Sequence, residues 1–568
     1  MLIPPLKPRQ AKEALIRLFK VLNQDPAKGE RDPYLATEYP ILAKFPYING
    51  GLFKDADIEI PPFTQEIVDL LLVDCARGFD WSQISPTIFG AVFESTLNPQ
   101  TRREGGMHYT SIENIHKVID PLFLDDLRAE FETIKTKNQR ALLTAFQDKL
   151  ASLTFFDPAC GSGNFLTETY LCLRQLENEV IELLNKIYVD KKLKRFQDSE
   201  QNRLAIAISP VKVSITQFYG IEINDFAVDV ARAALWIAKT QMLKRTEDIT
   251  QEQYEFLPLT TNGNIIEGNA LRIDWNDILP AEKCDYIMGN PPFVGAMIMS
   301  REQKEEMANI FNGVRGFGEL DYVAAWYKRA CDYMQNYNIF SAFVSTNSIC
   351  QGQQAAMLWE PLFKENLIIN FAYKTFRWDS EASLKAHVHC IIIGFSKNNS
   401  LQHKFIYEND SKKQATAINQ FLADAPIVFI KNQSNPVCKA PDMAFGSMPR
   451  DGGFFTITAD ELDALKKENN VALKFIKPYI GAQEFINNKK RYCLWLVDAS
   501  PQDIRQNAFI YDRVTSVRDF RLESKAKATQ KFAETPHLFC QIAQPDSDCS
   551  HRIFAKRYNC LRRCANYP

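Results

Sequence analysis

The chain has 568 residues, with 67 Lys and Arg residues, 69 Asp and Glu residues and a formal net charge of −2. This balance excludes binding of nucleic acid through an overall positive charge, so any polyanion site must be a local patch. The length predicts about three domains, at roughly 100–200 residues per domain, and the 46% hydrophobic content is ordinary for a soluble globular protein.

The first hundred residues are predicted to be mostly helical. Apolar residues at helical spacing predict helices over 9–25 and 64–80, and a Ser-Pro start signal predicts another over 84–97. No apolar run is long enough to span a membrane, and the first residues do not form a signal-peptide pattern. We therefore expect no membrane partner and a cytoplasmic location.

Strands and helices alternate from residue 153 onward. LTFFDPACGSG predicts a strand that runs into a Gly-rich turn, and SITQFYGIEIND, CDYIMGNPPF and IFSAFVSTN predict later strands with helices between them. Such alternation predicts an α/β fold with a parallel sheet covered on both faces. After about residue 400 the pattern becomes mixed α+β, and residues 501–536 are predicted to form one charged helix.

The turn after the first of these strands is the first candidate site. Asp157 ends the strand, and Gly161 and Gly163 permit a tight turn and close approach of the backbone to a ligand. A helix start follows, with free N–H groups. This pattern is typical of a nucleotide-like cofactor site, although a tight turn without a ligand remains an alternative. The Gly-Lys-Ser/Thr pattern of nucleoside triphosphate sites is missing from the sequence.

The next two strands end in polar residues. Glu222 ends the second strand, where an acid can accept hydrogen bonds from both ribose hydroxyls, and a solvated strand end is the alternative. Asn269 or Asp274 at the end of the third strand could meet the edge of an adenine ring.

The stretch MGNPPFVG follows the fourth strand. Asn290 can accept a hydrogen bond through its side-chain carbonyl. Pro291 and Pro292 have no N–H, so the backbone there offers carbonyls only, and their fixed φ stiffens the loop. Phe293 adds a flat face for stacking. These features favour a pocket for an amino group on a ring, against the alternative of a strand-ending turn with a buried Phe.

Taken in order, these motifs resemble the amino-methyltransferases that use S-adenosyl-L-methionine, and especially the N6-adenine DNA methyltransferases with their Rossmann-like class I fold. The resemblance implies that Asn290, Pro291, Pro292 and Phe293 are catalytic, with Phe293 stacking on a flipped adenine. Phe376, or alternatively Trp378, would form the second aromatic wall. The resemblance also implies a set of cofactor-binding residues: Tyr109, Thr110, Asp157, Pro158, Ala159, Gly161, Gly163, Asn164, Glu222 and Asn269.

Further stretches, including PYINGGLF, ISPTIFGAVFE and FGSMPRDGG, resemble the large MmeI-like restriction–modification enzymes. The resemblance implies a helical spacer over 1–100, a methyltransferase domain over 101–400 and a partial DNA target-recognition domain over 401–568. We expect the family's nuclease domain to be missing and the C-terminal end to be truncated, so that a separate restriction nuclease is a candidate partner.

Double-stranded DNA is the expected substrate. Basic residues of the charged segment would contact its phosphates, although a solvated helix face is an equal alternative; they are Arg513, Arg518, Arg521, Lys525, Lys527 and Lys531. The 13 cysteines are scattered, which favours reduced thiols, and we predict no metal site.

Three other functions stay open. The same Asn-Pro-Pro acceptor suits a glutamine amide, as in the release-factor methyltransferases, or a ribosomal RNA base. A chain without the nuclease and part of the recognition domain could also be a catalytically impaired DNA-binding remnant.

Overall fold

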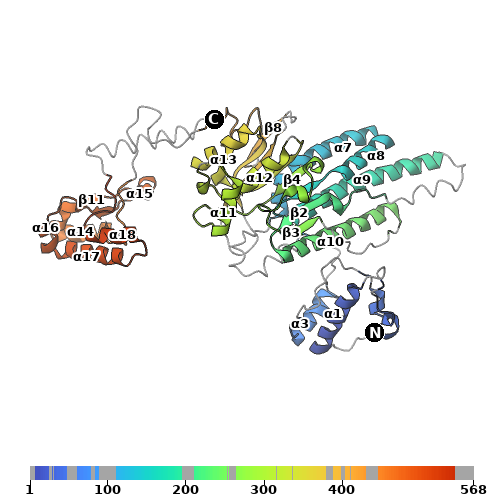
Figure 1. The fold of residues 1–568 in the computed structure, drawn as a ribbon, viewed down its shortest axis with the longest axis horizontal. Helices are drawn as coiled ribbons and strands as arrows, with labels where there is room; N and C mark the ends of the chain where they lie inside the picture. The colour runs from blue at the N-terminus through green and yellow to red at the C-terminus, as the bar shows by residue number, and fades with distance from the viewer. Residues whose placement is uncertain are drawn as a thin grey trace. The chain divides into compact units, whose positions relative to one another are not determined.

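The computed structural model describes most of the chain. The described residues are 7–24, 29, 31–45, 47, 60–78, 84–87, 110–194, 210–252, 254, 264–314, 316–335, 337–378, 388–397, 403–409, 411–429 and 446–543. Contacts within the chain divide it into two compact units, Met1–Asn432 and Gln433–Pro568, whose elements are labelled in Figure 1.

The described part of the N-terminal segment is helical. α1 (Pro8–Leu22) begins on a proline, and α3 (Gln65–Asp69) is capped by Thr64 and continues into the π-helical η3 (Leu70–Cys75). These elements confirm the helices predicted over 9–25 and 64–80. The helix predicted over 84–97 lies largely outside the described residues. Among the described residues between α1 and α3, the chain forms the short helices α2 (Leu35–Glu38) and η2 (Leu42–Lys44).

A nine-stranded sheet organises the larger unit, in the order β3-β2-β1-β4-β5-β7-β6-β8-β9. Neighbours among β1 to β5 pair in parallel, whereas β7 pairs antiparallel with β5 and β6. This order confirms the predicted Rossmann-like α/β class. The sheet continues past residue 400, where the alternation in the sequence fades. The strands are β1 (Phe155–Asp157), β2 (Phe218–Glu222), β3 (Ile265–Glu267), β4 (Tyr286–Gly289), β5 (Phe340–Thr346), β6 (Ile368–Trp378), β7 (Val388–Ser396), β8 (Lys404–Glu408) and β9 (Ser411–Ala415).

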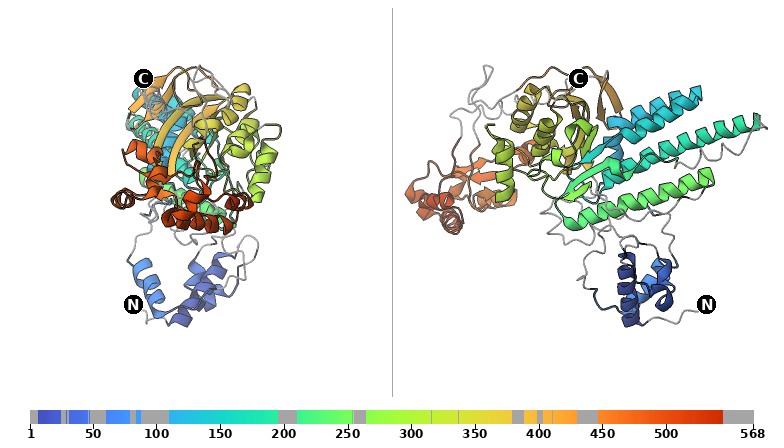
Figure 2. Two further views of the ribbon diagram at one scale, coloured as in Figure 1. Left: turned by 90° about the vertical axis from the view of Figure 1, so that its left-hand side faces the viewer. Right: turned by 45° about the vertical axis from the view of Figure 1, so that its right-hand side comes forward.

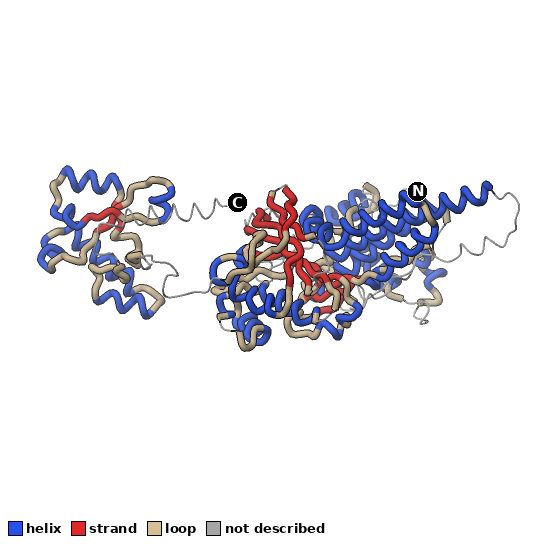
Figure 3. Tube along the Cα trace, turned by 90° about the horizontal axis from the view of Figure 1, so that it is seen from above, coloured by secondary structure: helices blue, strands red, loops and turns tan. Residues whose placement is uncertain are grey.

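Successive residues of the central strands face two different cores. Phe155 and Met288 belong to one hydrophobic core, whereas their neighbours Phe156 and Ile287 belong to the other. This period of two places the sheet between two sets of helices, as Figure 3 shows. The first set is α6 (Ile112–Ile119), α7 (Asp125–Lys137), α8 (Arg140–Ser152), α9 (Asn164–Lys194) and α10 (Asp225–Thr250), and the second is α11 (Arg301–Ile310), α12 (Ala324–Met334) and α13 (Gly352–Lys364).

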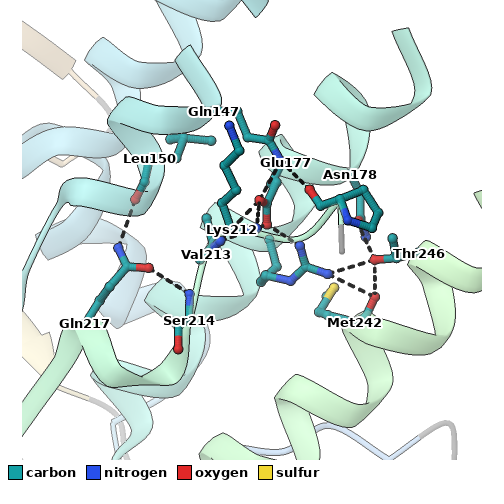
Figure 4. Close-up of polar contacts among 12 residues, drawn as sticks. Gln147, Leu150, Glu177, Asn178, Lys212, Val213, Ser214, Gln217, Met242 and Thr246 are labelled. Atoms are coloured by element: carbon teal, nitrogen blue, oxygen red, sulfur yellow. Dashed lines mark hydrogen bonds and ion pairs between the residues drawn. The ribbon is translucent and has the colours of Figure 1, made fainter. Parts of the chain in front are cut away.

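A buried ion pair within α9 makes further hydrogen bonds that tie this helix to its neighbours. The long helices α9 and α10 run side by side in Figure 2. Arg174 and Glu177 of α9 are both fully buried and pair with each other; Figure 4 labels Glu177 and its partners Gln147 and Val213. Glu177 also accepts hydrogen bonds from Gln147 of α8 at 2.9 Å and from the Val213 N–H at 3.1 Å. Arg174 donates to Thr246 Oγ1 of α10 at 2.7 Å. The pair therefore fixes the packing of three helices behind the sheet.

The second unit is a small α+β fold. β12 (Tyr492–Leu494) pairs antiparallel with β10 (Thr456–Ile457) and β11 (Ile476–Pro478), and Phe455 and Val517 lie in its core. The single charged helix predicted over 501–536 is wrong, because Asn507 ends one helix and caps the next by accepting the Ile510 N–H at 3.2 Å. The helices are α14 (Ala459–Lys467), α15 (Ala482–Ile486), α16 (Pro501–Gln506), α17 (Ala508–Leu522) and α18 (Lys527–Lys531). Among the helices described in either unit, none has the length and apolar character needed to cross a membrane.

We expect Glu177→Ala to lower the free energy of unfolding by about 3–5 kcal/mol, because Arg174 would stay buried without its counter-charge. Glu179→Ala is the matched control: Glu179 lies on the same helix with its side chain 51% exposed and pairs with Lys135. Its loss should be below about 1 kcal/mol. Chemical denaturation measures both, and equal losses would contradict a structural role for the buried pair.

Candidate active site

The Gly-rich loop joins β1 to α9 at the carboxyl edge of the sheet. Asp157 is fully buried, and its Oδ1 accepts the Ala159 N–H at 3.0 Å. Gly161 and Gly163 have φ of +53° and +77°, and a Cβ at Gly163 would lie 2.8 Å from the Ala231 Cβ of α10. A Cβ at Gly161 would meet nothing within 4 Å. Gly163 thus serves helix packing, whereas Gly161 borders open space. Pro158 is buried, and its carbonyl accepts the Trp326 indole N–H at 3.2 Å.

Glu222 lies beside this loop because β2 pairs in parallel with β1. One carboxylate oxygen accepts the Gly161 N–H at 2.8 Å and the other accepts the Asn224 N–H at 3.0 Å. Burial raises the pKa of Glu222, and these backbone hydrogen bonds oppose the rise. The next residue, Ile223, is 64% exposed, and Phe226 is also exposed. This pair of exposed apolar side chains was not predicted from the sequence, although an apolar residue directly after the acid was a usable signal.

Asn290 follows β4, the other neighbour of β1. Its Nδ2 donates to Thr110 Oγ1 at 3.2 Å, and Thr110 is buried. A Cβ at Gly289 would lie 2.4 Å from Asp157 Oδ1, so this glycine lets the Asp157 carboxylate press against the strand that presents Asn290. Pro291 is buried, while Pro292 and Phe293 are half-buried. The two loops thus meet at one point of the sheet.

Asp321 holds the Asn-Pro-Pro-Phe loop from the other side. Its Oδ1 accepts the N–H groups of Val294 and Val323, each at 3.2 Å, and its Oδ2 accepts the Thr346 hydroxyl at 3.2 Å. Burial raises the pKa of Asp321. Asp321 was not predicted from the sequence. The only signal was an acid shortly before a helix, which is common at helix starts.

Three buried oxygen atoms at this edge lack a hydrogen-bond partner among the described residues: Asp157 Oδ2, Asn164 Oδ1 and Asn290 Oδ1. Buried polar atoms are rarely left unpaired, since each costs about 1–3 kcal/mol. Burial, reinforced by the Glu222 charge and opposed by the Ala159 N–H, raises the pKa of Asp157 to about 8. The edge is therefore rich in acceptors that suit a ligand carrying donors or positive charge.

Four other predicted site residues have mixed outcomes. Both polar groups of Asn269 are used internally: Oδ1 accepts the Leu271 N–H at 2.9 Å and Nδ2 donates to Glu306 at 2.8 Å. Phe376 is half-buried in β6, with the Lys117 Nζ 5.2 Å from its ring centre. Tyr109 and the side chain of Trp378 lie outside the described residues.

The basic residues predicted to contact DNA divide into two groups. Arg521 is fully buried, and its guanidinium donates to five backbone carbonyls, including those of Arg450 at 3.1 Å and Phe532 at 2.9 Å. The prediction that it contacts DNA is wrong, because the side chain holds the second unit together. Arg513 is largely engaged with Glu461 and the Thr456 carbonyl. The exposed members are Arg518, Lys525, Lys527 and Lys531.

A Gly-rich loop after β1, an acid at the end of β2 and Asn-Pro-Pro-Phe after β4, on this sheet order, define a class I methyltransferase architecture. Residues 131–408 match the family model of the DNA-methyltransferase domain of MmeI, and residues 424–558 match that of the MmeI target recognition domain. The chain belongs to the MmeI family.

Two relatives give the extent of the similarity. The solved structure of the Type IIL restriction-modification enzyme MmeI in complex with DNA is 41% identical, with a TM-score of 0.80, and the match covers 94% of this chain and 69% of that one. DNA methyltransferase A of Bacillus subtilis is 37% identical over 530 residues, which is 92% of this chain. The chain spans 56% of the length of that B. subtilis protein.

We expect Gly289→Ala to destabilise the larger unit by about 1–3 kcal/mol, because the new methyl group would overlap the Asp157 carboxylate. Gly295→Ala lies on the same loop, where a Cβ would meet nothing within 4 Å, and should change stability by less than about 0.5 kcal/mol. Thermal unfolding of the two variants checks this. Equal stabilities of the two variants would show that the Asp157 carboxylate does not need the space left by the absent side chain of Gly289.

Proposed function

We propose that this protein transfers a methyl group from S-adenosyl-L-methionine to the N6 amino group of adenine at a specific site in double-stranded DNA, as the modification activity of a restriction–modification system. The observation that carries this proposal is the buried Asn290 carbonyl oxygen, which has no partner among the described residues and is held beside two prolines. An amino group needs acceptors, and this loop offers acceptors in a rigid setting.

The residues around the Gly-rich loop fit the proposed cofactor. Asp157 Oδ2 and Asn164 Oδ1 are buried acceptors that would hold its ammonium group, and the open space at Gly161 admits close backbone approach. Glu222 would accept the ribose hydroxyls, since each of its oxygens retains a lone pair beyond its backbone bond. Ile223 would supply an apolar surface for the adenine ring. When bound, the cofactor supplies a methyl group activated by a sulfonium charge.

The chain's own residues would then act on the target amino group. Asn290 Oδ1 and the Pro291 carbonyl would accept its two hydrogens and orient the nitrogen lone pair, while Phe293 would stack on the base. No strong base is needed, because positioning and electrostatics supply the rate. A base within a duplex must be flipped out to reach such a pocket, which costs a few kcal/mol.

DNA is favoured as the substrate by the match of residues 424–558 to a target recognition domain and by the DNA complex of MmeI. The exposed Arg518, Lys525 and Lys527 of the second unit would contact phosphates, which would make binding depend on salt. A separate restriction nuclease as partner stays a prediction from the sequence. A methyltransferase acting on RNA or on glutamine would not need a recognition domain for DNA.

Incubation with methyl-labelled S-adenosyl-L-methionine and a mixture of DNA, RNA and protein tests the proposal. We expect label in DNA only, and at least a hundredfold slower transfer by Asn290→Ala, comparable to removing one oriented polar group from a catalytic site. Label in RNA or protein would support the alternative substrates. No transfer by a chain that binds the cofactor and DNA would support the impaired remnant.

Thr110 offers a sharper test of how Asn290 is oriented. Thr110→Val keeps the shape but removes the hydroxyl that accepts the Asn290 Nδ2–H. We expect turnover to fall about tenfold, equivalent to ~1.4 kcal/mol, with cofactor affinity nearly unchanged. Thr110→Ser retains the hydroxyl and should stay within about threefold of the parent. If both variants lose the same activity, the hydrogen bond does not orient the amide.

A further inference from the structure

A cluster of three side chains lies between α6 and α9, apart from the Asn-Pro-Pro-Phe loop. His116 belongs to α6, and Glu168 and Cys172 lie one turn apart on α9. One ligand atom from each lies within 4.8 Å of the other two. His116 Nε2 is 3.2 Å from Glu168 Oε1, and Cys172 Sγ is 3.8 Å from the same oxygen. Three different donor types therefore converge on one point.

The separations of 3.2 and 3.8 Å from the Glu168 oxygen suit a small tetrahedral cation. Zinc bonds of about 2.0–2.3 Å at tetrahedral angles place ligand atoms roughly 3.3–3.8 Å apart. Imidazole nitrogen, thiolate sulfur and carboxylate oxygen are the zinc ligands found in proteins. The side chains of His116 and Glu168 are 26% and 12% exposed, so an ion can enter from solvent.

Asp120 adds the outer contact that such a histidine needs. Its Oδ1 is 2.8 Å from His116 Nδ1, which leaves Nε2 directed toward Glu168. A carboxylate on the second ring nitrogen fixes the ring and its tautomer in zinc sites. Arg128 lies 3.4 Å from the same Asp120 oxygen and holds that carboxylate from outside.

We infer that His116, Glu168 and Cys172 form a three-ligand zinc site with an open fourth position. The site goes beyond the proposed methyl transfer and does not rest on it. Both helices that carry the ligands begin at the candidate active site. α6 begins two residues after Thr110, which contacts Asn290, and α9 begins at Asn164 of the Gly-rich loop. An ion bridging the two helices would hold both loops in register.

The competing account is a cluster held by a proton. Hydrogen bonds to Asp120, Cys172 and Glu168 raise the pKa of His116 to about 12. The imidazolium would then stabilise the fold fully below its ordinary pKa of 6.5, and this contribution would be lost progressively as pH rises from there through about 12. Both accounts need the same carboxylates, so a measurement of bound metal must separate them.

The test uses the full chain, stripped with a chelator and dialysed against micromolar Zn²⁺ or Co²⁺. We expect one zinc per chain by elemental analysis and, with cobalt, a near-ultraviolet band from a thiolate–cobalt bond. His116→Gln and Cys172→Ser should lose the ion, whereas the controls His403→Gln and Cys540→Ser should retain it. Asp120→Asn should weaken binding about 10- to 100-fold while keeping all three ligands.

The parent chain alone can overturn the inference, whatever the variants do. Failure to retain zinc, or a cobalt spectrum without a thiolate band, would leave the proton-held cluster as the correct account. Retention of the ion by both His116→Gln and Cys172→Ser would place it elsewhere. Glu168→Gln preserves the side-chain volume and should also lower zinc retention. This variant tests the site if the His116 and Cys172 variants do not fold.

Discussion

The close approach of the Asp157 carboxylate to Gly289 is the constraint on which the rest of the site depends. β1 and β4 are parallel neighbours, with Phe155 opposite Tyr286, so their carboxyl ends lie together. Because Gly289 has no side chain, the carboxylate occupies space within 2.4 Å of where a Cβ would be. This contact joins the Gly-rich loop to the Asn290 loop. Cofactor and target base could meet only if these two loops keep this relation.

The site keeps polar atoms without a partner among the described residues, at a cost in stability. Asp157 has a folded-state pKa above its ordinary value of 3.8, so its contribution makes the chain less stable as pH rises from about 4 through about 8. A bound ammonium group would offset that loss by stabilising the ionised carboxylate. Asn290 Oδ1, which has no partner among the described residues, likewise carries a desolvation penalty that a bound amino group would relieve. These costs are understandable if the atoms serve a ligand, since strain and unpaired groups concentrate at functional sites.

The sheet and the strand-end motifs were predictable because parallel strands place their carboxyl ends on one edge, where Asp157, Glu222 and Asn290 were expected. Contacts between distant parts of the chain were not. The bond from Asn290 to Thr110 spans 180 residues, and Asp321 carries no motif. Charge alone was also a poor guide to Arg521, because its guanidinium is buried against backbone carbonyls and no local sequence pattern reveals that burial. The His116 cluster could not be predicted for the same reason, as His116 lies 52 residues before Glu168 and on a different helix.

The central claim is that the Asn290 loop presents an amino group to the cofactor loop. Nucleoside analysis of DNA methylated by this protein with methyl-labelled S-adenosyl-L-methionine tests it most directly. We expect the label to elute as N6-methyladenine, because the loop supplies hydrogen-bond acceptors for an exocyclic amino group. Label in 5-methylcytosine would contradict it, since methylation at a ring carbon requires a nucleophile adding to the base, and an amide and two prolines provide none.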